Sequence, residues 1–564
     1  MQSSWSEPVG AKDDLDIRVH TSRLLGEKSD LVLHGGGNTS VKSIVKNIFG
    51  EDEEILFVKG SGWDLATIAR AGFAPVKMQT LLKLAELETL SDTDMVNSQR
   101  AAMINPNAPT PSIEAILHAI LPFKFVDHTH ADAVVTVTNT PKGEEFIKEI
   151  YGDSVIIIPY VMPGFILAKE IAKHIKGRDL SNIDALILMN HGVFTFDDDA
   201  KKSYEKMIAV VDKAEQFIAK SAKGFNALKA DTFDALQISK IRKKASEIKG
   251  SAMIIKYDDG EISREFASRP KAKELASVGP LTPDHVIRTK QKGVFIDSLT
   301  SLDEYAKEYE EYFKRNNDGT LTMLDRAPRW GVVNGATISF GQNVSDANII
   351  HDIKEHTLSS ILNAKSLCRY ETLSEAEIFK MEYWELEQAK LKKGSFAPEF
   401  SGKIVLITGG ASGIGKACVE QFVKLRAAVV ALDINPAVES MYKSAQILGI
   451  ACDLTKKEQI DAAIKKAVKA FGGIDILVNS AEVSNIITTL VSPFLKSGID
   501  PAIVYITSTD ANSEILSLPP EIRINTIYSD KVFDTAVCNN IADLACAMAG
   551  KLFSKVNGAK LVVG

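Results

Sequence analysis

Residues 404–415 read IVLITGGASGIG, which predicts a buried β-strand that runs directly into a glycine-rich turn. A helix is predicted next, and residues 428–433 (AVVALD) predict a second strand that ends at Asp433. This order of strand, glycine-rich turn, helix and strand opens a dinucleotide-binding βαβ unit, in which backbone N–H groups and a helix N-terminus hold a pyrophosphate. The stretch therefore predicts a doubly wound α/β domain that begins near residue 403.

The whole chain, at 564 residues, is too long for one such unit. A net charge of -7 and a pI near 5.9 give no reason to expect nucleic acid or an anionic membrane as a partner. The most apolar stretch, residues 154–168, is short and broken by prolines, so it predicts a buried strand and turn. The five scattered cysteines and the absence of a secretory pattern at the N-terminus indicate a cytoplasmic protein.

Residues 1–245 alternate apolar, strand-like runs with amphipathic helices, which is the pattern of an α/β domain. The strand-like runs include residues 55–58, 133–137, 155–158 and 185–189. A long helix is predicted over residues 205–222.

The chain changes character twice after this first part. Residues 246–395 are mixed, with an acidic helix predicted over 301–315 and a charged helix over 374–393. Residues 394–402 are rich in small residues and proline, which is typical of a linker. We therefore predict three domains, over residues 1–245, 246–395 and 396–564.

Histidine and carboxylate side chains in the first domain follow a pattern that suits a metal ion. His128 and His130 are separated by one residue, so on a strand both rings project from one face. Glu114 and His118 are one helical turn apart, and His191 follows a predicted buried strand. A lone H-x-H pair is also typical of hydrogen-bonded histidines, but Glu114, His128, His130 and His191 together predict a site for a divalent metal such as zinc.

Two loops of small polar residues precede these histidines. Residues 35–42 (GGGNTSVK) and 59–62 (KGSG) offer backbone N–H groups, hydroxyls and a cation. Loops of this kind bind phosphate, although glycine runs also occur in ordinary turns. Beside a metal site they indicate a phosphorylated small-molecule substrate.

On these motifs, residues 1–245 resemble the class II aldolase/adducin family. The resemblance implies zinc held by Glu114, His128, His130 and His191, with Glu114 also acting as a base and His118 as a structural support. It implies that Tyr160 donates a proton. It also implies substrate-phosphate contacts at Gly37, Asn38, Ser61, Gly62 and Ser112. The implied reaction is cleavage of a ketose 1-phosphate, similar to rhamnulose 1-phosphate, into dihydroxyacetone phosphate and an aldehyde by a homo-oligomer. A Schiff-base lysine is the alternative aldolase mechanism.

The longer pattern resembles bifunctional proteins of the rhamnulose-1-phosphate aldolase/alcohol dehydrogenase type, in which a class II aldolase is fused to a short-chain dehydrogenase. Residues 279–285 (GPLTPDH) and 382–387 (EYWELE) fit that arrangement. Asp284 and His285 either approach the active site or simply begin a helix after a turn.

Residues 408–415 (TGGASGIG) resemble the glycine-rich turn of the short-chain dehydrogenase family. The implied cofactor contacts are Gly409, Ser412, Gly413, Ile414, Gly415, Asp433, Asp453 and Asn479. A carboxylate at Asp433 would accept from ribose hydroxyls and repel a 2′-phosphate, which favours NAD over NADP. Ser508 matches the position of the family's catalytic serine.

This last domain also departs from the family pattern. Glu482 replaces a glycine of the family's N-N-A-G motif, and no Tyr-x-x-x-Lys pair follows Ser508, because Tyr528 and Lys531 are three apart. Too little chain separates Asn479 from Ser508 for the helices that the family inserts there. We interpret the domain as a shortened, degenerate Rossmann-type domain with weak NAD binding. An NAD-dependent oxidoreductase and a non-catalytic, adducin-like scaffold stay open as alternative functions.

Overall fold

The protein is described by a computed structural model over residues 1–221, 233–391, 398–481, 485–508, 519–529 and 535–563. The chain forms two compact units. The first comprises Met1–Phe225, Val278–Gln291 and Glu355–Lys393, and the second comprises Asn226–Ser277, Lys292–Lys354 and Gly394–Gly564. Within the described residues, no helix combines the length and apolar character that a membrane crossing requires.

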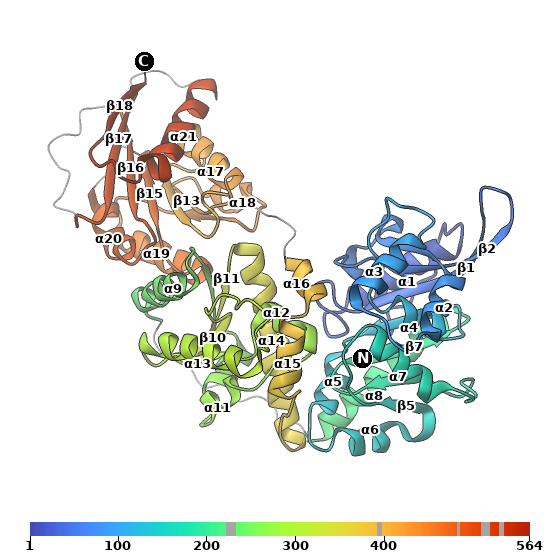
Figure 1. Cartoon of the computed structure of the whole chain (residues 1–564). Helices are drawn as coiled ribbons and strands as arrows, with labels where there is room; N and C mark the ends of the chain where they lie inside the picture. The colour runs from blue at the N-terminus through green and yellow to red at the C-terminus, as the bar shows by residue number, and fades with distance from the viewer. Residues whose placement is uncertain (222–232, 392–397, 482–484, 509–518, 530–534, 564) are drawn as a thin grey trace. The chain divides into compact units, whose positions relative to one another are not determined.

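The first unit is built on a seven-stranded sheet of order β3-β2-β1-β4-β7-β6-β5. Strands β1, β2, β5 and β7 of this sheet are labelled in Figure 1. All neighbouring strands are antiparallel except the parallel pair β5 and β6. The strands are β1 (Asn38–Lys46), β2 (Asp52–Lys59), β3 (Phe73–Lys77), β4 (Phe125–Thr129), β5 (Val155–Ile158), β6 (Ala185–Leu188) and β7 (Gly192–Asp197). The principal helices are α1 (Asp14–Gly26), α2 (Met78–Glu86), α3 (Asp92–Ala101), α4 (Ala115–Ile120), α5 (Asp132–Thr138), α6 (Gly143–Tyr151), α7 (Phe165–Ile175) and α8 (Ala200–Ser221).

Helices cover both faces of this sheet because its strands are apolar on both faces. Along β6, Leu186 and Leu188 join a core with α2, α4 and α7. Ala185 and Ile187 point the other way and join a second core with α5, α6 and α8. This alternation follows from the two-residue period of a strand. The first unit also contains the short helices η4 (Pro283–His285), α12 (Val286–Thr289), α15 (Glu375–Glu382) and α16 (Glu385–Leu391).

The prediction of a strand over residues 133–137 is wrong, because this segment lies in helix α5. Its β-branched residues favour a strand locally, but every residue from Ala133 to Thr138 is buried. A helix that is apolar all round has no period that distinguishes it from a buried strand. The predicted helix over 374–393 is in fact two helices, α15 and α16, which break at Tyr383 and Trp384.

The expectation that the chain between Asn479 and Ser508 is too short for a helix is also wrong, because helix α20 (Asn485–Lys496) lies there. The remaining predictions of elements agree with the structure. Residues 55–58 lie in β2, residues 155–158 form β5, and residues 185–188 form β6. The long helix expected over 205–222 is α8, which begins earlier, at Ala200, and residue 222 lies outside the described residues. The acidic helix expected over 301–315 is α13 (Thr300–Asn316) of the second unit.

The second unit contains a four-stranded sheet and a seven-stranded sheet. The smaller sheet has the order β8-β11-β10-β9, with β8 (Ile254–Asp258), β9 (Val294–Phe295), β10 (Trp330–Val333) and β11 (Ala336–Gly341). It is accompanied by α9 (Ala235–Lys249), α10 (Glu261–Ala267), α11 (Ala272–Ala276), α13 and the part of α14 (Val344–Leu367) that ends at Lys354.

The larger sheet of the second unit is parallel throughout, in the order β14-β13-β12-β15-β16-β17-β18. Its strands are β12 (Ile404–Thr408), β13 (Ala428–Asp433), β14 (Ile447–Ala451), β15 (Ile476–Asn479), β16 (Ala502–Thr507), β17 (Arg523–Ser529) and β18 (Lys560–Val563). Its helices are α17 (Gly413–Lys424), α18 (Val438–Met441), α19 (Lys457–Phe471), α20 (Asn485–Lys496) and α21 (Thr535–Ala549). This is a doubly wound, Rossmann-type sheet, so the predicted α/β fold class is confirmed.

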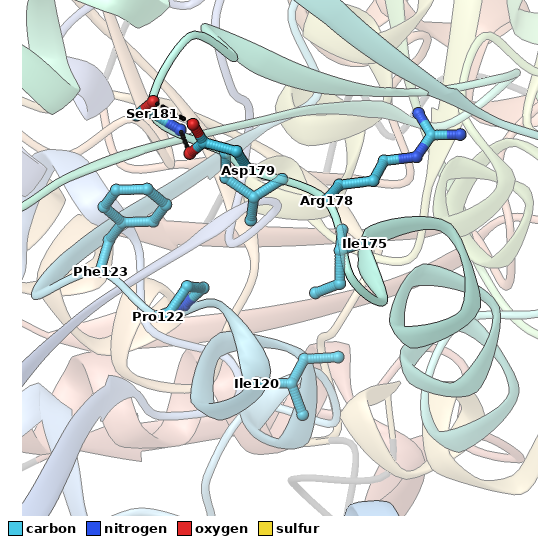
Figure 2. Close-up of a pocket in the computed structure, with 8 residues that line it drawn as sticks. Ile120, Pro122, Phe123, Ile175, Arg178, Asp179 and Ser181 are labelled. Carbon is cyan, nitrogen blue, oxygen red and sulfur yellow. Dashed lines mark hydrogen bonds between the residues drawn. The ribbon is translucent and has the colours of Figure 1, made fainter.

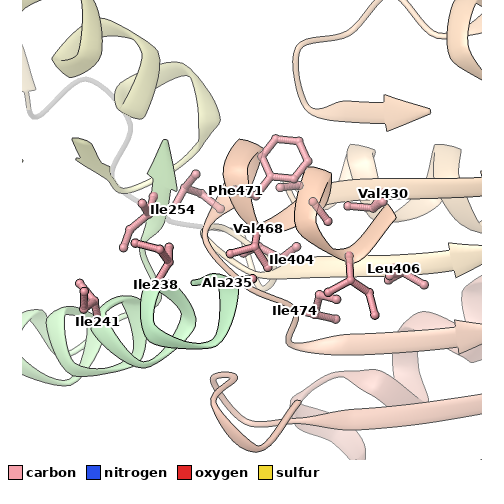
Figure 3. Close-up of a cluster of buried hydrophobic side chains, with 14 of the residues drawn as sticks. Ala235, Ile238, Ile241, Ile254, Ile404, Leu406, Val430, Val468, Phe471 and Ile474 are labelled. Atoms are coloured by element: carbon pink, nitrogen blue, oxygen red, sulfur yellow. The ribbon is translucent and has the colours of Figure 1, made fainter. Parts of the chain in front are cut away.

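One apolar core connects the parallel sheet with the region that precedes it in the sequence. Ile238 of α9 and Ile254 of β8 belong to the same buried cluster as Ile404 of β12 and Val468 of α19 (Figure 3). The three-domain division at residues 245 and 395 stays a prediction.

Candidate metal centre

Three histidines meet at one edge of the sheet in the first unit. Strands β4 and β6 are both antiparallel to β7, which lies between them, so their carboxyl ends reach the same edge. His128 is on β4, His130 directly follows β4, and His191 lies between β6 and β7. The ring centroids are 4.9 Å apart for His128 and His130, 5.1 Å for His128 and His191, and 5.0 Å for His130 and His191. One ligand atom from each ring can therefore reach a common ion.

Glu114 brings a carboxylate to these rings from the start of α4, where it is only 4 % exposed. Its Oε2 atom lies 3.6 Å from His128 Nε2, and its Oε1 atom lies 3.9 Å from His191 Nε2. Asn38 Nδ2 donates to Glu114 Oε2 at 2.6 Å. Within the described residues, Glu114 Oε1 is buried and accepts no hydrogen bond. A buried carboxylate oxygen without a partner is costly, and a cation at this point would remove that cost.

The orientation of the rings presents Nε2 atoms toward this centre. His128 Nδ1 lies 3.1 Å from the carbonyl oxygen of Val193, so Nδ1 carries the proton and donates it, which leaves Nε2 with a lone pair. His130 Nε2 lies 3.2 Å from His128 Nε2. Zinc–nitrogen bonds of about 2.0–2.1 Å in a tetrahedral site separate two ligand atoms by about 3.3–3.4 Å. The donor set and spacing therefore fit zinc.

Burial keeps the imidazoles of His128 and His191 in the neutral form that binds metal. Burial and the neighbouring His130 lower the pKa of His128 well below its usual value. Burial lowers the pKa of His191 to about 3, against the opposing effect of Glu114. Because neutral imidazole is the ligand form, His128 and His191 do not have to lose a proton at neutral pH before they bind a cation.

His118 supports this centre without being one of its ligands. It is fully buried, its Nδ1 atom lies 2.8 Å from Ser40 Oγ, and its Nε2 atom contacts Asn38 Oδ1. Asn38 in turn donates to Glu114. His118 therefore holds the amide that orients the carboxylate.

The loop predicted over residues 35–42 is shorter in the structure, because residues 38–42 lie in β1. Its glycines, which precede β1, lie against the histidine strand β4. Gly37 has a φ of +56°, and a Cβ atom there would lie 2.6 Å from the carbonyl oxygen of His128. Lys59 Nζ donates to the carbonyl oxygens of Gly35 and Gly37 at 2.7 and 2.9 Å. The cation noticed in the sequence at Lys59 therefore holds the loop together.

The other residues predicted to bind phosphate lie in two different environments. Ser61 and Gly62 line a hollow of about 540 Å³ together with Trp63 and Pro109. Ser112 is buried, and its Oγ atom accepts the backbone N–H of Glu114 at 3.2 Å. The serine hydroxyl thus supports the start of α4.

Tyr160, the predicted proton donor, is half-buried after β5. Burial raises the pKa of its hydroxyl, and the negative charges of Glu377 and Asp284 raise this pKa further. The hydroxyl is therefore protonated at neutral pH, as a donor must be.

A second hollow, of about 530 Å³, is lined by residues that lie near the amino ends of β4 and β6. Figure 2 draws these side chains. The hollow is lined by Ile120, Pro122 and Phe123, which precede β4, and by residues 178–181, which precede β6. Asp179 accepts hydrogen bonds from the backbone N–H and the hydroxyl of Ser181. The amino ends of β4 and β6 are remote from their carboxyl ends, so this hollow is separate from the metal centre.

The glycine-rich turn of the second unit has the geometry of a nucleotide site. Gly409 and Gly413 have φ values of +66° and +51°, and Ser412 precedes the helix that includes Ile414. A Cβ atom at Gly415 would lie 2.0 Å from the carbonyl oxygen of Gly409. The turn therefore needs glycine for its backbone path, and it leads into the N-terminus of α17.

Polar residues surround this turn at the carboxyl edge of the parallel sheet. Asp433 accepts from the backbone N–H groups of Ala411 and Asn435, at 2.9 Å each. Asn479 Oδ1 accepts from the hydroxyl of Thr408 at 2.8 Å.

Two further predicted residues lie beyond strand ends of the same sheet. Asp453 follows β14, and its carboxylate accepts from the backbone N–H and the hydroxyl of Thr455. Ser508 is exposed directly after β16. Glu482 and Lys531 lie outside the described residues.

Comparison with known families agrees with both units. The family described as "Class II Aldolase and Adducin N-terminal domain" matches residues 18–218, "Aldolase class II, second domain" matches 232–391, and "short chain dehydrogenase" matches 403–497. The fold and these matches define a class II aldolase joined to a short-chain dehydrogenase domain. Class II aldolases are typically metal-dependent, and short-chain dehydrogenases bind NAD(H).

Relatives extend the match to most of the chain. The uncharacterized oxidoreductase YuxG of Bacillus subtilis is 31% identical over 497 residues, covering 82% of this chain and 72% of the relative. The chain therefore belongs to this family of aldolase–dehydrogenase fusion proteins. An NAD-dependent glycerol dehydrogenase of Listeria innocua is 44% identical over 87 residues, which cover 14% of this chain and 34% of that protein. The N-terminal class II aldolase domain of a conserved Thermoplasma acidophilum protein is 42% identical, covers 39% of this chain and 99% of its own, and has a TM-score of 0.36.

Proposed function

We propose that this protein is a zinc-dependent aldolase that cleaves a ketose 1-phosphate of the rhamnulose 1-phosphate type into dihydroxyacetone phosphate and an aldehyde. One observation carries the proposal. The buried Oε1 atom of Glu114 accepts no hydrogen bond from the described residues and lies beside three gathered histidines. A divalent cation is the partner that this arrangement of donors suits.

Glu114, His128, His130 and His191 would hold the metal, which supplies Lewis-acid polarisation of the substrate carbonyl. In the direction of condensation, Glu114 Oε1 takes a proton from the substrate carbon that becomes the nucleophile. Tyr160 then gives its hydroxyl proton to the aldehyde oxygen as the carbon–carbon bond forms. Cleavage is the reverse sequence, in which the proton returns to the substrate carbon.

Asn38 contributes by holding only one oxygen of Glu114. Its amide occupies Oε2, so Oε1 is the oxygen that would face the metal and that, once it leaves the metal, takes the proton. We propose that the substrate phosphate lies among Gly37, Asn38, Ser61, Gly62 and Ser112, close to the loop that Lys59 holds. Assembly into a homo-oligomer and a cytoplasmic location stay predictions.

The test is cleavage of L-rhamnulose 1-phosphate, followed by detection of dihydroxyacetone phosphate, with chelator and then with added Zn²⁺. We expect chelator to stop cleavage, Zn²⁺ to restore it, and Glu114→Gln to lower it by about 10²-fold or more, as loss of a general base does. Glu144→Gln is the matched control, because Glu144 is exposed and pairs with Lys148 in α6. Cleavage that chelator does not affect would contradict the metal mechanism. A chain that takes up no metal would favour the scaffold.

A second candidate function, an NAD-dependent oxidoreductase, is favoured by the intact glycine-rich turn and by Asp433. We propose that the second unit binds NAD weakly and has lost turnover, because Ser508 has no Tyr-x-x-x-Lys pair after it. NADH fluorescence should rise on titration with the protein. Substrate oxidation that disappears in Ser508→Ala would overturn the proposed loss of turnover.

A further inference from the structure

We propose that Asp284 is a positioning residue of the metal centre, whose carboxylate holds His130 so that Nε2 of this ring faces the metal. The inference rests on the proposed metal function. It assigns part of the centre to a segment that lies outside residues 18–218, the range of the N-terminal aldolase family match.

The contact is made by the ring nitrogen that does not face the other ligands. His130 Nδ1 lies 3.3 Å from Asp284 Oδ1, while His130 Nε2 lies 3.2 Å from His128 Nε2. A carboxylate accepts hydrogen bonds, so it places the ring proton on Nδ1. Nε2 then keeps its lone pair and points toward the centre.

Asp284 orients the ring of His130 through Nδ1, just as a backbone carbonyl group orients the ring of His128. The carbonyl oxygen of Val193 lies 3.1 Å from His128 Nδ1 and fixes the same tautomer. A carboxylate is the stronger acceptor, because it also stabilises positive charge that develops on the ring when the metal withdraws electrons. His130 is therefore the ligand whose basicity depends on a side chain.

The Asp284 carboxylate is itself held in place. The hydroxyl of Thr282 donates to Asp284 Oδ1 at 2.6 Å, and Pro283 begins the short helix η4. Thr282 is 1 % exposed and His285 is 7 % exposed, so buried residues flank the carboxylate on both sides. Little conformational freedom is left to it, as a positioning role requires.

The same segment is tied to the loop that carries His191. Asn139 Nδ2 donates to the carbonyl oxygen of Leu281 at 2.7 Å. Asn190, the residue before His191, donates through Nδ2 to Asn139 Oδ1 at 2.8 Å. Asn139 thus connects the segment of Asp284 with the loop of His191, and both loops are held in one arrangement.

The experiment measures Zn²⁺ affinity of the full chain by competition with a chromophoric chelator, without any substrate. We expect Asp284→Ala to weaken Zn²⁺ binding about 10–100-fold, which is the usual cost of losing such a partner. Asp284→Asn, which keeps one acceptor oxygen, should lose less. Asp179→Asn is the control, because Asp179 accepts hydrogen bonds from Ser181 in a turn near the amino ends of β4 and β6, away from the metal centre.

Two further measurements separate the possible failures. Co²⁺ bound to the wild type and to Asp284→Ala should differ in visible absorption, and both metal-free proteins should melt at the same temperature. An unchanged Zn²⁺ affinity in Asp284→Ala would overturn the positioning role, as would a fall in affinity that accompanies loss of the metal-free fold. A wild-type chain that binds no Zn²⁺ would instead overturn the proposed metal function itself.

Discussion

Removing the carboxylate of Asp475 should destabilise the second unit more than removing any exposed acidic group in it. Asp475 precedes β15 and forms a two-pronged ion pair with Arg242 of α9. Arg242 Nη1 lies 2.9 Å from Asp475 Oδ1, and Arg242 Nη2 lies 2.6 Å from Oδ2. Both side chains are 0% exposed.

The expected loss in unfolding free energy follows from the buried groups that Asp475→Ala leaves without a partner. A buried guanidinium without its counter-charge costs about 3–5 kcal/mol of unfolding free energy. The backbone N–H groups of Ile404 and Ile499 also donate to this carboxylate, at 2.8 and 2.6 Å. Each of these N–H groups loses its acceptor, which lowers the free energy of unfolding by about 1–3 kcal/mol for a buried donor that finds no other acceptor. A loss of about 5 kcal/mol is a large part of the 5–15 kcal/mol that typically stabilises a folded domain.

The assay is scanning calorimetry of the full chain, compared with the matched variant Asp303→Ala. Asp303 pairs at 2.7 Å with Lys244 of α9, the helix that also holds Arg242, but the side chain of Asp303 is 53% exposed. This exposed pair should contribute about 1 kcal/mol or less. We expect the transition of the second unit to fall by roughly 10 °C in Asp475→Ala and by at most a few degrees in Asp303→Ala. Equal shifts in the two variants would refute the reasoning.

Three further predictions concern the pH dependence of the Asp475–Arg242 pair and two glycines that pack closely against a backbone carbonyl group. Burial would raise the pKa of Asp475, but Arg242 lowers this pKa below the usual 3.8. The stabilisation by the pair is therefore present above pH 3.8 and is lost as the pH falls toward the lowered pKa. Acid unfolding curves of the wild type and Asp475→Ala should converge there, and curves that stay parallel would contradict this. Gly192→Ala should abolish Zn²⁺ uptake measured by elemental analysis, because its Cβ would lie 2.3 Å from the carbonyl oxygen of Thr129, and wild-type metal content would show that the strands can shift. Gly415→Ala should abolish the rise in NADH fluorescence, since its Cβ would lie 2.0 Å from the Gly409 carbonyl oxygen, and an unchanged signal would show that NADH binds elsewhere.

Local patterns made the fold class predictable. The turn over residues 408–415 was predictable because its positive φ values and the following helix depend on residues adjacent in the chain. The one-residue spacing of His128 and His130 works in a similar way, since side chains two residues apart on extended backbone leave the same side, and His130 directly follows the strand that holds His128. Where the pattern was ambiguous, as in the wholly buried helix α5, the tertiary core decided between strand and helix.

The sequence by itself determined that this chain has a strand–turn–helix nucleotide motif and a pair of histidines suited to a metal. Only the tertiary structure decided what lies around them. Strand order brings His191 and Glu114 to His128, and the segment at Asp284 reaches His130 from far along the chain. The hydrogen bonds from Lys59 to the glycine loop before β1 and the pairing of Arg242 with Asp475 are equally non-local. The reason is physical, because spacing along the backbone governs only near neighbours, whereas contacts between distant residues depend on which strands and helices share a core.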